Sequence, residues 1–176
     1  MTRIFWLFGR SGAGKTTLAM RLQQGLRDRA IPVFFIDGDE ARGGLSSDLG
    51  FHPEARTEHH RRVAEVARLA SRQGIVPIVA TMAPEYSQRD VVRRTLGQRL
   101  VWVFVDAPLE ECLRRDPKGL YKRAKSGEVR NLLEYPFDTP RGEECNVTVQ
   151  TGRAGIEESY NDLLREVLSH LADHNI

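Results

Sequence analysis

The chain contains five short apolar segments, rich in β-branched and aromatic residues, separated by longer segments of mixed polarity. In the first four, the apolar residues follow one another almost without alternation, which is typical of strands buried on both faces of a parallel sheet. The pattern predicts strands at Ile4–Phe8, Pro32–Ile36, Ile75–Ala80, Leu100–Val105 and Asn146–Gln150.

Three of the intervening segments have helical periodicity. Leucines recur every four residues within Lys15–Arg29, and apolar stripes predict further helices over Arg56–Arg72 and Ile156–Leu171. Strands and helices therefore alternate, which predicts an α/β fold: a central, mostly parallel five-stranded sheet flanked by helices, with right-handed crossovers. The length of 176 residues fits one domain over 1–176.

Composition narrows the possible partners. Lys and Arg number 26 against 24 Asp and Glu, a net charge of +2, which is too balanced to predict nucleic-acid binding. No apolar run approaches the roughly 20 residues of a membrane span, and the first residues lack the cleavage site of a signal peptide. The isolated cysteines, Cys112 and Cys145, predict reduced thiols and a cytoplasmic location.

The segment GRSGAGKTT, Gly9–Thr17, follows the first strand and opens the first helix. It matches the phosphate-loop pattern G-x-x-x-x-G-K-[ST], in which backbone N–H groups and the helix N-terminus bind phosphates. Lys15 can bridge the β- and γ-phosphates of ATP, and the Thr16 hydroxyl can ligate Mg²⁺. A glycine-rich turn that binds nothing would not need both Lys and Thr. The predicted nucleotide-binding residues are Gly9, Ser11, Gly12, Ala13, Gly14, Lys15, Thr16 and Thr17.

The use of the nucleotide is not set by this loop. Base recognition of the GTPase type needs an Asn-Lys-x-Asp segment, which the sequence lacks, and the short chain favours a compact kinase. After the second strand come Asp37, Asp39 and Arg42. Asp37 is placed to orient Mg²⁺ or an attacking hydroxyl, with Asp39 and Arg42 on the acceptor. A solvated acidic turn explains the same residues equally well.

Two further regions carry candidate acceptor contacts. Phe51 can stack on a base or anchor its loop in the core. The basic group after it can grip an anion, but its charge pattern favours a solvated helical face paired with Glu58 and Glu65. Residues 116–144 predict a helical lid and a following loop, with Arg115, Lys118 and Lys122 as candidates to neutralise a transferring phosphoryl group. The basic group consists of Arg56, His59, His60, Arg61 and Arg62.

Taken together, these segments resemble the adenylyl-sulfate (APS) kinase family over nearly the whole chain. The resemblance rests on GRSGAGKTT, the DGDxxR pattern at 37–42, LSSDLGF at 45–51, Arg56, RRVAEVARL at 61–69, VDAPLEEC and RDPKGLYKRAKSGE. It implies the P-loop kinase fold with a lid, and phosphorylation by ATP of the 3′-hydroxyl of adenosine 5′-phosphosulfate. It also implies a homodimer.

The resemblance further implies individual roles. Lys15 and Asp37 are expected to be catalytic, and Thr16 and Asp37 to hold Mg²⁺. Acceptor contacts are expected from a set that includes two positions where this chain departs from the family: Asp39, Arg42, Phe51, Arg56, His59, Lys118 and Leu132.

The departures gather on the acceptor side. Glu40 and His59 stand where the family has Asn, Met82-Ala83-Pro84-Glu85 replaces Ile-Ser-Pro-Tyr, and Asn131-Leu132 replaces Gly-Phe. One hypothesis is an altered acceptor, such as cytidine diphosphoramidate; the alternative is ordinary variation among APS kinases. An RNA-end kinase is disfavoured by the balanced charge. A regulator without transfer activity would lose Lys15 or Asp37, and both are present.

Overall fold

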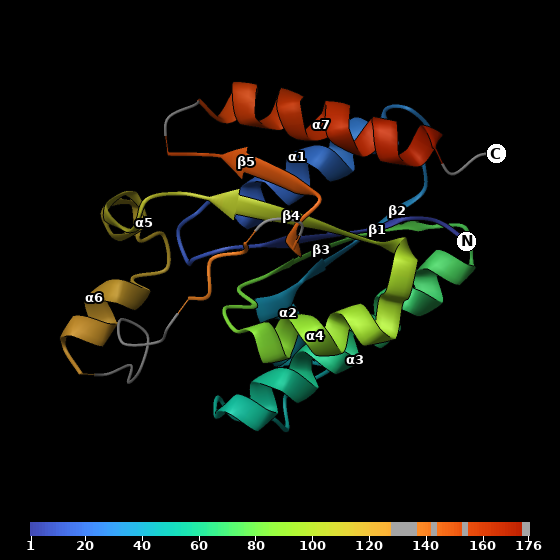
Figure 1. Cartoon of the computed structure of the whole chain (residues 1–176). Coiled ribbons are helices and arrows are strands. Elements are labelled where there is room, and N and C mark those ends of the chain that lie inside the picture. The colour runs from blue at the N-terminus through green and yellow to red at the C-terminus, as the bar shows by residue number, and fades with distance from the viewer. Residues whose placement is uncertain (128–136, 142–143, 153–154, 174–176) are drawn as a thin grey trace.

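The computed structural model describes residues 1–127, 137–141, 144–152 and 155–173. Within them, five strands form one sheet in the order β2-β3-β1-β4-β5, and every neighbouring pair is parallel (Figure 1). The strands are β1 (Ile4–Phe8), β2 (Val33–Asp37), β3 (Val76–Thr81), β4 (Leu100–Asp106) and β5 (Val147–Gln150).

Helices cover both faces of this sheet. In Figure 1, α1 and α7 lie on one face, and α3 and α4 lie on the other. The short helices α5 and α6 lie beyond the carboxyl ends of the strands, where the arrowheads point. The helices are α1 (Lys15–Arg27), α2 (Gly38–Gly43), α3 (Pro53–Arg72), α4 (Tyr86–Leu96), α5 (Leu109–Arg115), α6 (Leu120–Lys125) and α7 (Ile156–Ala172), with a 3₁₀ turn at Gly97–Arg99.

The core has two layers, one on each side of the central strand. All five residues of β1 are fully buried, and their side chains alternate between the layers. Phe5 and Leu7 pack with Leu18, Leu22 and Leu163 from the α1 and α7 side. On the other side, a second cluster joins β1 to α3 and α4: Ile4, Trp6, Phe8, Val63, Ala67, Val92 and Leu96.

The predicted parallel sheet is confirmed, with strand ends within one residue of those expected. Expected burial on both faces is wrong for β2, because β2 is an edge strand and Phe34 is half-exposed. The α3 helix begins earlier than predicted because His52 caps it and Pro53 occupies its first turn. Helix α4 has no counterpart among the elements predicted from the sequence.

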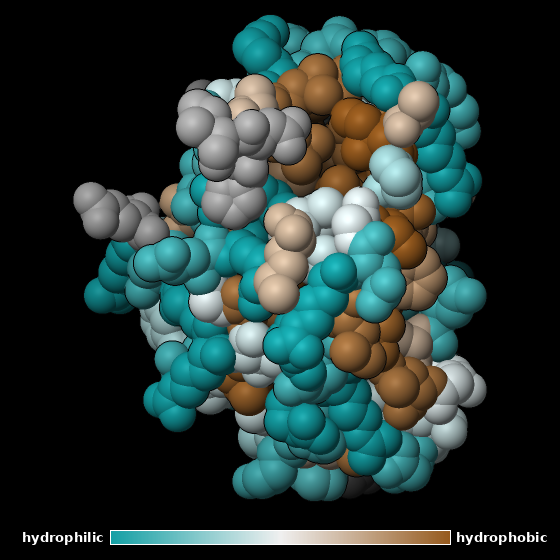
Figure 2. Space-filling view, turned by 90° about the vertical axis from the view of Figure 1, so that its right-hand side faces the viewer, coloured by the Kyte–Doolittle hydropathy of each residue, from teal (hydrophilic) through white to brown (hydrophobic). Residues whose placement is uncertain are grey.

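No helix in the described ranges is long and apolar enough to cross a membrane. Figure 2 shows the side of the molecule at the amino ends of the strands, where apolar residues gather in patches among polar ones. The phosphate loop follows β1 at the opposite, carboxyl edge of the sheet. The connections that position the chemistry therefore lie on the far side from this view.

The predicted lid is described only in part. Its first half contains helix α6, and its end is described from Phe137. The expected acceptor residue Leu132 lies outside the described residues, as does the Asn131 departure.

Candidate phosphate-transfer site

The phosphate loop turns tightly between β1 and α1. Gly9, Gly12 and Gly14 have positive φ angles of 153°, 78° and 98°. A Cβ atom on Gly9 would clash with the carbonyl oxygen of Val105, and one on Gly12 would lie 2.7 Å from the Cys112 carbonyl oxygen. Glycine is therefore needed at both positions, for backbone conformation and for space. The remaining loop residues lead into the N-terminus of α1, whose free N–H groups attract anions.

Lys15 is the first residue of α1, and its ammonium group bends back over the loop. Its Nζ donates a hydrogen bond of 2.7 Å to the carbonyl oxygen of Arg10. Burial lowers the pKa of Lys15 to about 8, with Asp39 and Asp37 acting in the opposite direction. A partly desolvated cation inside the loop is suited to a phosphate, which supplies the negative charge that the site lacks.

Asp37 joins the phosphate loop to the end of β2. Its Oδ2 accepts a 2.9 Å hydrogen bond from the Thr16 hydroxyl. Its Oδ1 accepts from the backbone N–H groups of Asp39, at 2.8 Å, and Glu40, at 3.4 Å, and so caps α2. The carboxylate that caps this acidic turn also contacts the hydroxyl of the phosphate loop, so the two interpretations of Asp37 are compatible.

These oxygens fit a magnesium ion. The described residues contain no group of three or more His, Cys, Asp or Glu side chains that could hold a metal by themselves. Mg²⁺ in nucleotide sites takes only one or two protein ligands, and substrate phosphates and water supply the rest. The adjacent hydroxyl of Thr16 and carboxylate of Asp37 meet that requirement.

Lys118 reaches the same site from the lid. It lies just before α6 and forms an ion pair with Asp39 on α2. Both side chains are exposed, so the pair is screened by solvent. The expected acceptor residues Asp39 and Lys118 are therefore brought together, beside Asp37.

Phe51, Arg42 and Arg56 form a second group. The ring of Phe51 is 68% exposed, which rules out the interpretation that it anchors the loop in the core. The guanidinium carbons of Arg42 and Arg56 lie 4.8 and 5.8 Å from the ring centroid. Arg42 also donates to the Gly50 carbonyl oxygen at 3.0 Å, and Arg56 Nε to that of Phe51 at 2.7 Å. Two cations and an exposed aromatic ring thus share one surface.

His59 and His60 are buried in the first half of α3. His59 Nδ1 lies 3.0 Å from the Ser46 hydroxyl, and His60 Nδ1 lies 2.7 Å from the Arg56 carbonyl oxygen. Burial lowers the pKa of His59 to about 3 and that of His60 to about 4, so both rings are neutral at pH 7. The expected acceptor contact of His59 stays a prediction.

The other two arginines of this segment form the solvated helical face. Arg61 and Arg62 pair with Glu58 at 2.7 and 3.0 Å, and Arg62 also pairs with Asp48 at 2.6 Å. The hydrogen bond from Arg61 lowers the pKa of Glu58 to about 2. Arg61 and Arg62 are thus engaged with carboxylates of their own surface.

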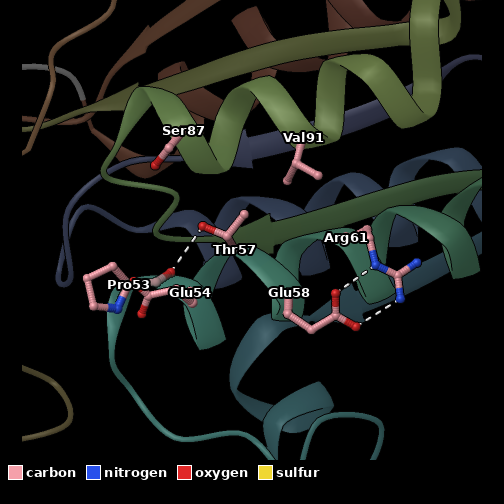
Figure 3. Close-up of a pocket in the computed structure, with 7 residues that line it drawn as sticks. All are labelled: Pro53, Glu54, Thr57, Glu58, Arg61, Ser87 and Val91. Carbon is pink, nitrogen blue, oxygen red and sulfur yellow. Dashed lines mark hydrogen bonds and ion pairs between the residues drawn. The ribbon is translucent and has the colours of Figure 1, made fainter.

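A pocket of about 410 Å³ lies between the amino-terminal halves of α3 and α4 (Figure 3). Two carboxylates and two hydroxyls contribute to its wall, and the Glu58–Arg61 pair lies along it. Two carboxylates in its wall disfavour a phosphate ligand, so this pocket differs in chemistry from the phosphate loop. It is lined by Pro53, Glu54, Thr57, Glu58, Arg61, Ser87 and Val91.

The lid begins with contacts to the phosphate loop. The buried Tyr121 donates from its hydroxyl to the Ser11 carbonyl oxygen at 3.1 Å, and burial raises the pKa of Tyr121 to about 12. Arg115 donates to the carbonyl oxygens of Gly12, at 3.4 Å, and Thr151, at 2.6 Å. Tyr121 and Thr151 are not among the site residues predicted from the sequence. The only available signal was the apolar ring of Tyr121 within a basic segment.

Comparison with known proteins was consistent with this geometry. A model of the adenylylsulphate kinase family matches residues 1–150. The adenylyl-sulfate kinase of Paraburkholderia xenovorans is 42% identical over 168 residues, which cover 94% of this chain and 93% of that one. That of Clostridium acetobutylicum is 38% identical over 169 residues, covering 95% and 84%.

Solved structures agree. The Mycobacterium tuberculosis APS kinase CysC in complex with AMPPNP and APS matches with a TM-score of 0.87 and 32% identity, covering 97% of this chain and 98% of that one. A shikimate kinase from Acinetobacter baumannii matches in fold, with a TM-score of 0.61 and 21% identity over all of this chain and 96% of that one. The fold is the P-loop kinase fold, and the chain belongs to the adenylyl-sulfate kinase family.

Proposed function

We propose that this protein transfers the γ-phosphoryl group of ATP to the 3′-hydroxyl of adenosine 5′-phosphosulfate. The observation that carries the proposal is the 2.9 Å contact between Thr16 and Asp37. It joins the phosphate loop to a carboxylate at the carboxyl end of the neighbouring strand, where an acceptor hydroxyl would meet the γ-phosphate. Family membership and the relatives named adenylyl-sulfate kinase support the same reaction.

The donor half of the mechanism follows from the loop. Backbone N–H groups and the Lys15 ammonium bind the phosphates of ATP and hold the γ-phosphate facing Asp37. Thr16 and Asp37 would hold Mg²⁺, which supplies further neutralisation of phosphate charge when bound. During transfer, the acceptor oxygen bonds to the γ-phosphorus, the bond to the β,γ-bridging oxygen breaks, and ADP leaves.

The acceptor half uses the surface on α2 and α3. Asp37 orients the attacking hydroxyl, and its carboxylate accepts the hydroxyl proton as the new P–O bond forms. Phe51 offers a ring face for the adenine, and Arg42 and Arg56 offer guanidinium groups for the phosphosulfate. Lys118 leaves Asp39 to neutralise the transferring phosphoryl group when the lid closes. His59 and Leu132 remain proposed acceptor contacts.

Glu40 is the residue that supports a second candidate for the phosphoryl acceptor. This exposed carboxylate lies in the first turn of α2, beside an acceptor surface built for anions. Its charge opposes the phosphosulfate of APS, and Leu132 stands where the family has a second aromatic ring, so the alternative is an acceptor with a smaller base, such as cytidine diphosphoramidate.

The test is steady-state ADP release with Mg-ATP and a panel of APS, cytidine 5′-diphosphate derivatives and short RNA. Turnover with APS at micromolar concentration supports the proposal, and turnover with a cytidine compound alone replaces it. Asp37→Asn should lower kcat by about 10²- to 10⁴-fold while sparing ATP binding, because the amide orients the hydroxyl poorly. Glu110→Gln, at an exposed position of α5, serves as the charge-matched control and should keep the native rate.

The assembly and location are also proposals. We expect a homodimer in the cytoplasm, on the resemblance and the free thiols of Cys112 and Cys145. A relative from Thiobacillus denitrificans is described as hexameric, and this chain covers 29% of that one. Sedimentation equilibrium distinguishes a dimer from a monomer or a hexamer.

A further inference from the structure

Arg89 is a buried cation that the proposed mechanism does not use. It lies on the inner face of α4 and is 1% exposed. Its Nη1 donates to the carbonyl oxygens of Ala83, at 2.9 Å, and Pro84, at 3.2 Å, and its Nη2 donates to that of Asp138, at 2.8 Å. Burying a guanidinium costs free energy unless its donors are satisfied, and burial lowers the pKa of Arg89. Its two Nη groups bond to two backbone segments far apart in the chain, whereas the buried Nε has no hydrogen-bond partner among the described residues.

The first segment is the loop after β3. In the sheet register Ala80 of β3 lies opposite Asp37 of β2, so Ala83 and Pro84 follow at the edge that carries Asp37. Ala83 has a φ angle of 41°, which a residue with a Cβ atom seldom adopts. The Arg89 bonds to Ala83 and Pro84 hold this conformation in place.

The second segment, Phe137–Thr139, is the described end of the chain that leaves the lid. Asp138 donates its N–H to the Pro84 carbonyl oxygen at 2.8 Å, and its Oδ2 accepts from the Tyr86 N–H at 3.0 Å. The Tyr86 hydroxyl donates to the Thr139 carbonyl oxygen at 3.2 Å. Arg89 lies 4.5 Å from the Tyr86 ring centroid, so it supports both partners of this contact.

The same segment also contacts the phosphate loop. The Phe137 ring stacks on Phe104 of β4 at 6.0 Å, and the Arg10 guanidinium lies 4.9 Å from its centroid. Arg89 itself lies 5.3 Å from the ring of Phe8, the residue before the loop. Arg89 therefore stands where the phosphate loop, the loop after β3 and the end of the lid meet.

We propose that Arg89 is a positioning residue for phosphoryl transfer: it holds Ala83–Pro84 and the end of the lid against the phosphate loop, and so places the acceptor. The inference rests on the proposed function. All of its hydrogen bonds go to the loop after β3 or to the end of the lid, its contact with Phe8 is through the ring face alone, and Lys15 and Thr16 keep their own contacts. Loss of Arg89 should therefore weaken use of the acceptor more than use of ATP.

The experiment compares Arg89→Lys with native enzyme at varied APS and varied ATP. Lysine keeps the charge but has no planar fork to reach three carbonyl oxygens. The KM for APS should rise about tenfold, and the KM for ATP should stay within about twofold. Arg93→Lys is the matched control, because Arg93 lies one turn along α4, donates to the Glu144 carbonyl oxygen and contacts Trp102 instead. It should leave both constants unchanged.

Asp138 gives a milder variant in case Arg89→Lys does not fold. Asp138→Ala removes the oxygen that accepts the hydrogen bond from the Tyr86 N–H, and should raise the KM for APS about threefold. Asp138→Asn keeps a side-chain carbonyl oxygen at this position and should have the native KM for APS. A purely structural role would move kcat and both KM values together, or none of them. Either result in the folded variants would overturn the inference.

Amide hydrogen exchange separates this inference from the proposed function. In Arg89→Lys, the Tyr86 and Asp138 amides should exchange at least about tenfold faster, while affinity for an ATP analogue is unchanged. If native enzyme does not phosphorylate APS, the proposed function fails, and the inference is judged on this comparison alone. The inference would then be overturned if the Tyr86 and Asp138 amides of the variant exchanged at native rates, or if faster exchange came with a loss of affinity for the ATP analogue.

Discussion

Lys15 and Asp37 are each held by contacts with the backbone of a neighbouring segment. Lys15 donates to the Arg10 carbonyl oxygen, and Asp37 accepts from two N–H groups at the start of α2. These contacts preorganise the charges before any ligand binds, so less reorganisation is needed when phosphates arrive. For Lys15 the arrangement also has a cost, because its ammonium is partly desolvated.

The affinity for ATP should therefore fall as the pH rises through about 8. Burial lowers the pKa of Lys15 to about 8, so free protein loses this charge above that pH, whereas bound phosphate favours the charged form. Below pH 8 the affinity should be flat, and above it the loss should approach about tenfold per pH unit. Calorimetric titration of an ATP analogue between pH 7.5 and 9.5 measures this.

Lys15→Arg is the control for this titration, because a guanidinium stays charged throughout the range. Its profile should be flat whatever its absolute affinity. A flat native profile would contradict the assignment of Lys15 as the titrating group.

The histidines show where residue-level prediction from sequence fails. His59 and His60 stand among three arginines, so charge pattern places them on a basic surface. The structure buries both, because they lie one turn before Val63 and Ala64 on the inner face of α3. Helical spacing was the signal that could have identified them, and it carries more weight than composition when polar residues line an apolar stripe.

At the scale of elements, the phosphate loop owes its shape to glycines packed against neighbouring backbone. Gly9→Ala should destabilise the fold by at least about 2 kcal/mol and abolish ATP binding, because the new Cβ would clash with the Val105 carbonyl oxygen and the φ angle is positive. Urea unfolding and ATP-analogue titration measure the two effects.

Gly43→Ala is the matched change at a place with room. Gly43 ends α2, nothing lies within 4 Å of its Cβ position, and its φ angle is not positive. Stability should be unchanged or rise by up to about 1 kcal/mol. If Gly9→Ala were as stable as Gly43→Ala, the clash with Val105 would be relieved by movement of β4, and the prediction would be contradicted.

Elements with a strong hydrophobic pattern are predicted correctly from the sequence, and elements without one are not. The strands are apolar runs bounded by polar residues, and the sequence predicts them within one residue. Helix α4 was missed because YSQRDVVRRTL has only three aliphatic residues, and its inner face is completed by the buried side chains of Gln88 and Arg89. Helix α2 was interpreted as a turn because its start depends on Asp37, whose capping contact has no periodic signal.

At the scale of the whole molecule, the strand order sets β1 in the centre, with β3 and β2 on one side and β4 and β5 on the other. On the first side lie Asp37, which follows β2, and Ala83 and Pro84, which follow β3. Lys118 reaches Asp39 from the lid. This convergence follows from topology, which motif spacing alone does not reveal.

Removal of Mg²⁺ should abolish transfer and leave the fold intact. The described residues hold no metal cluster that could stabilise the chain by itself, so EDTA should change the free energy of unfolding of the nucleotide-free protein by less than about 0.5 kcal/mol. ADP release should stop and return when Mg²⁺ is added in excess. Unfolding on addition of EDTA would reveal a structural metal and contradict this account.

The two described ends of the lid segment share one anchor. Tyr121 donates to Ser11 at its start, and Phe137 lies beneath the guanidinium of Arg10 at its end. The intervening chain is therefore attached to the phosphate loop at both described ends, and these ends cannot move apart. Linking two attachment points by one chain lowers the conformational entropy of the detached state, so each attachment costs less entropy than it would alone. Cutting the peptide backbone once between Tyr121 and Phe137 would release that restraint and leave both anchors in place.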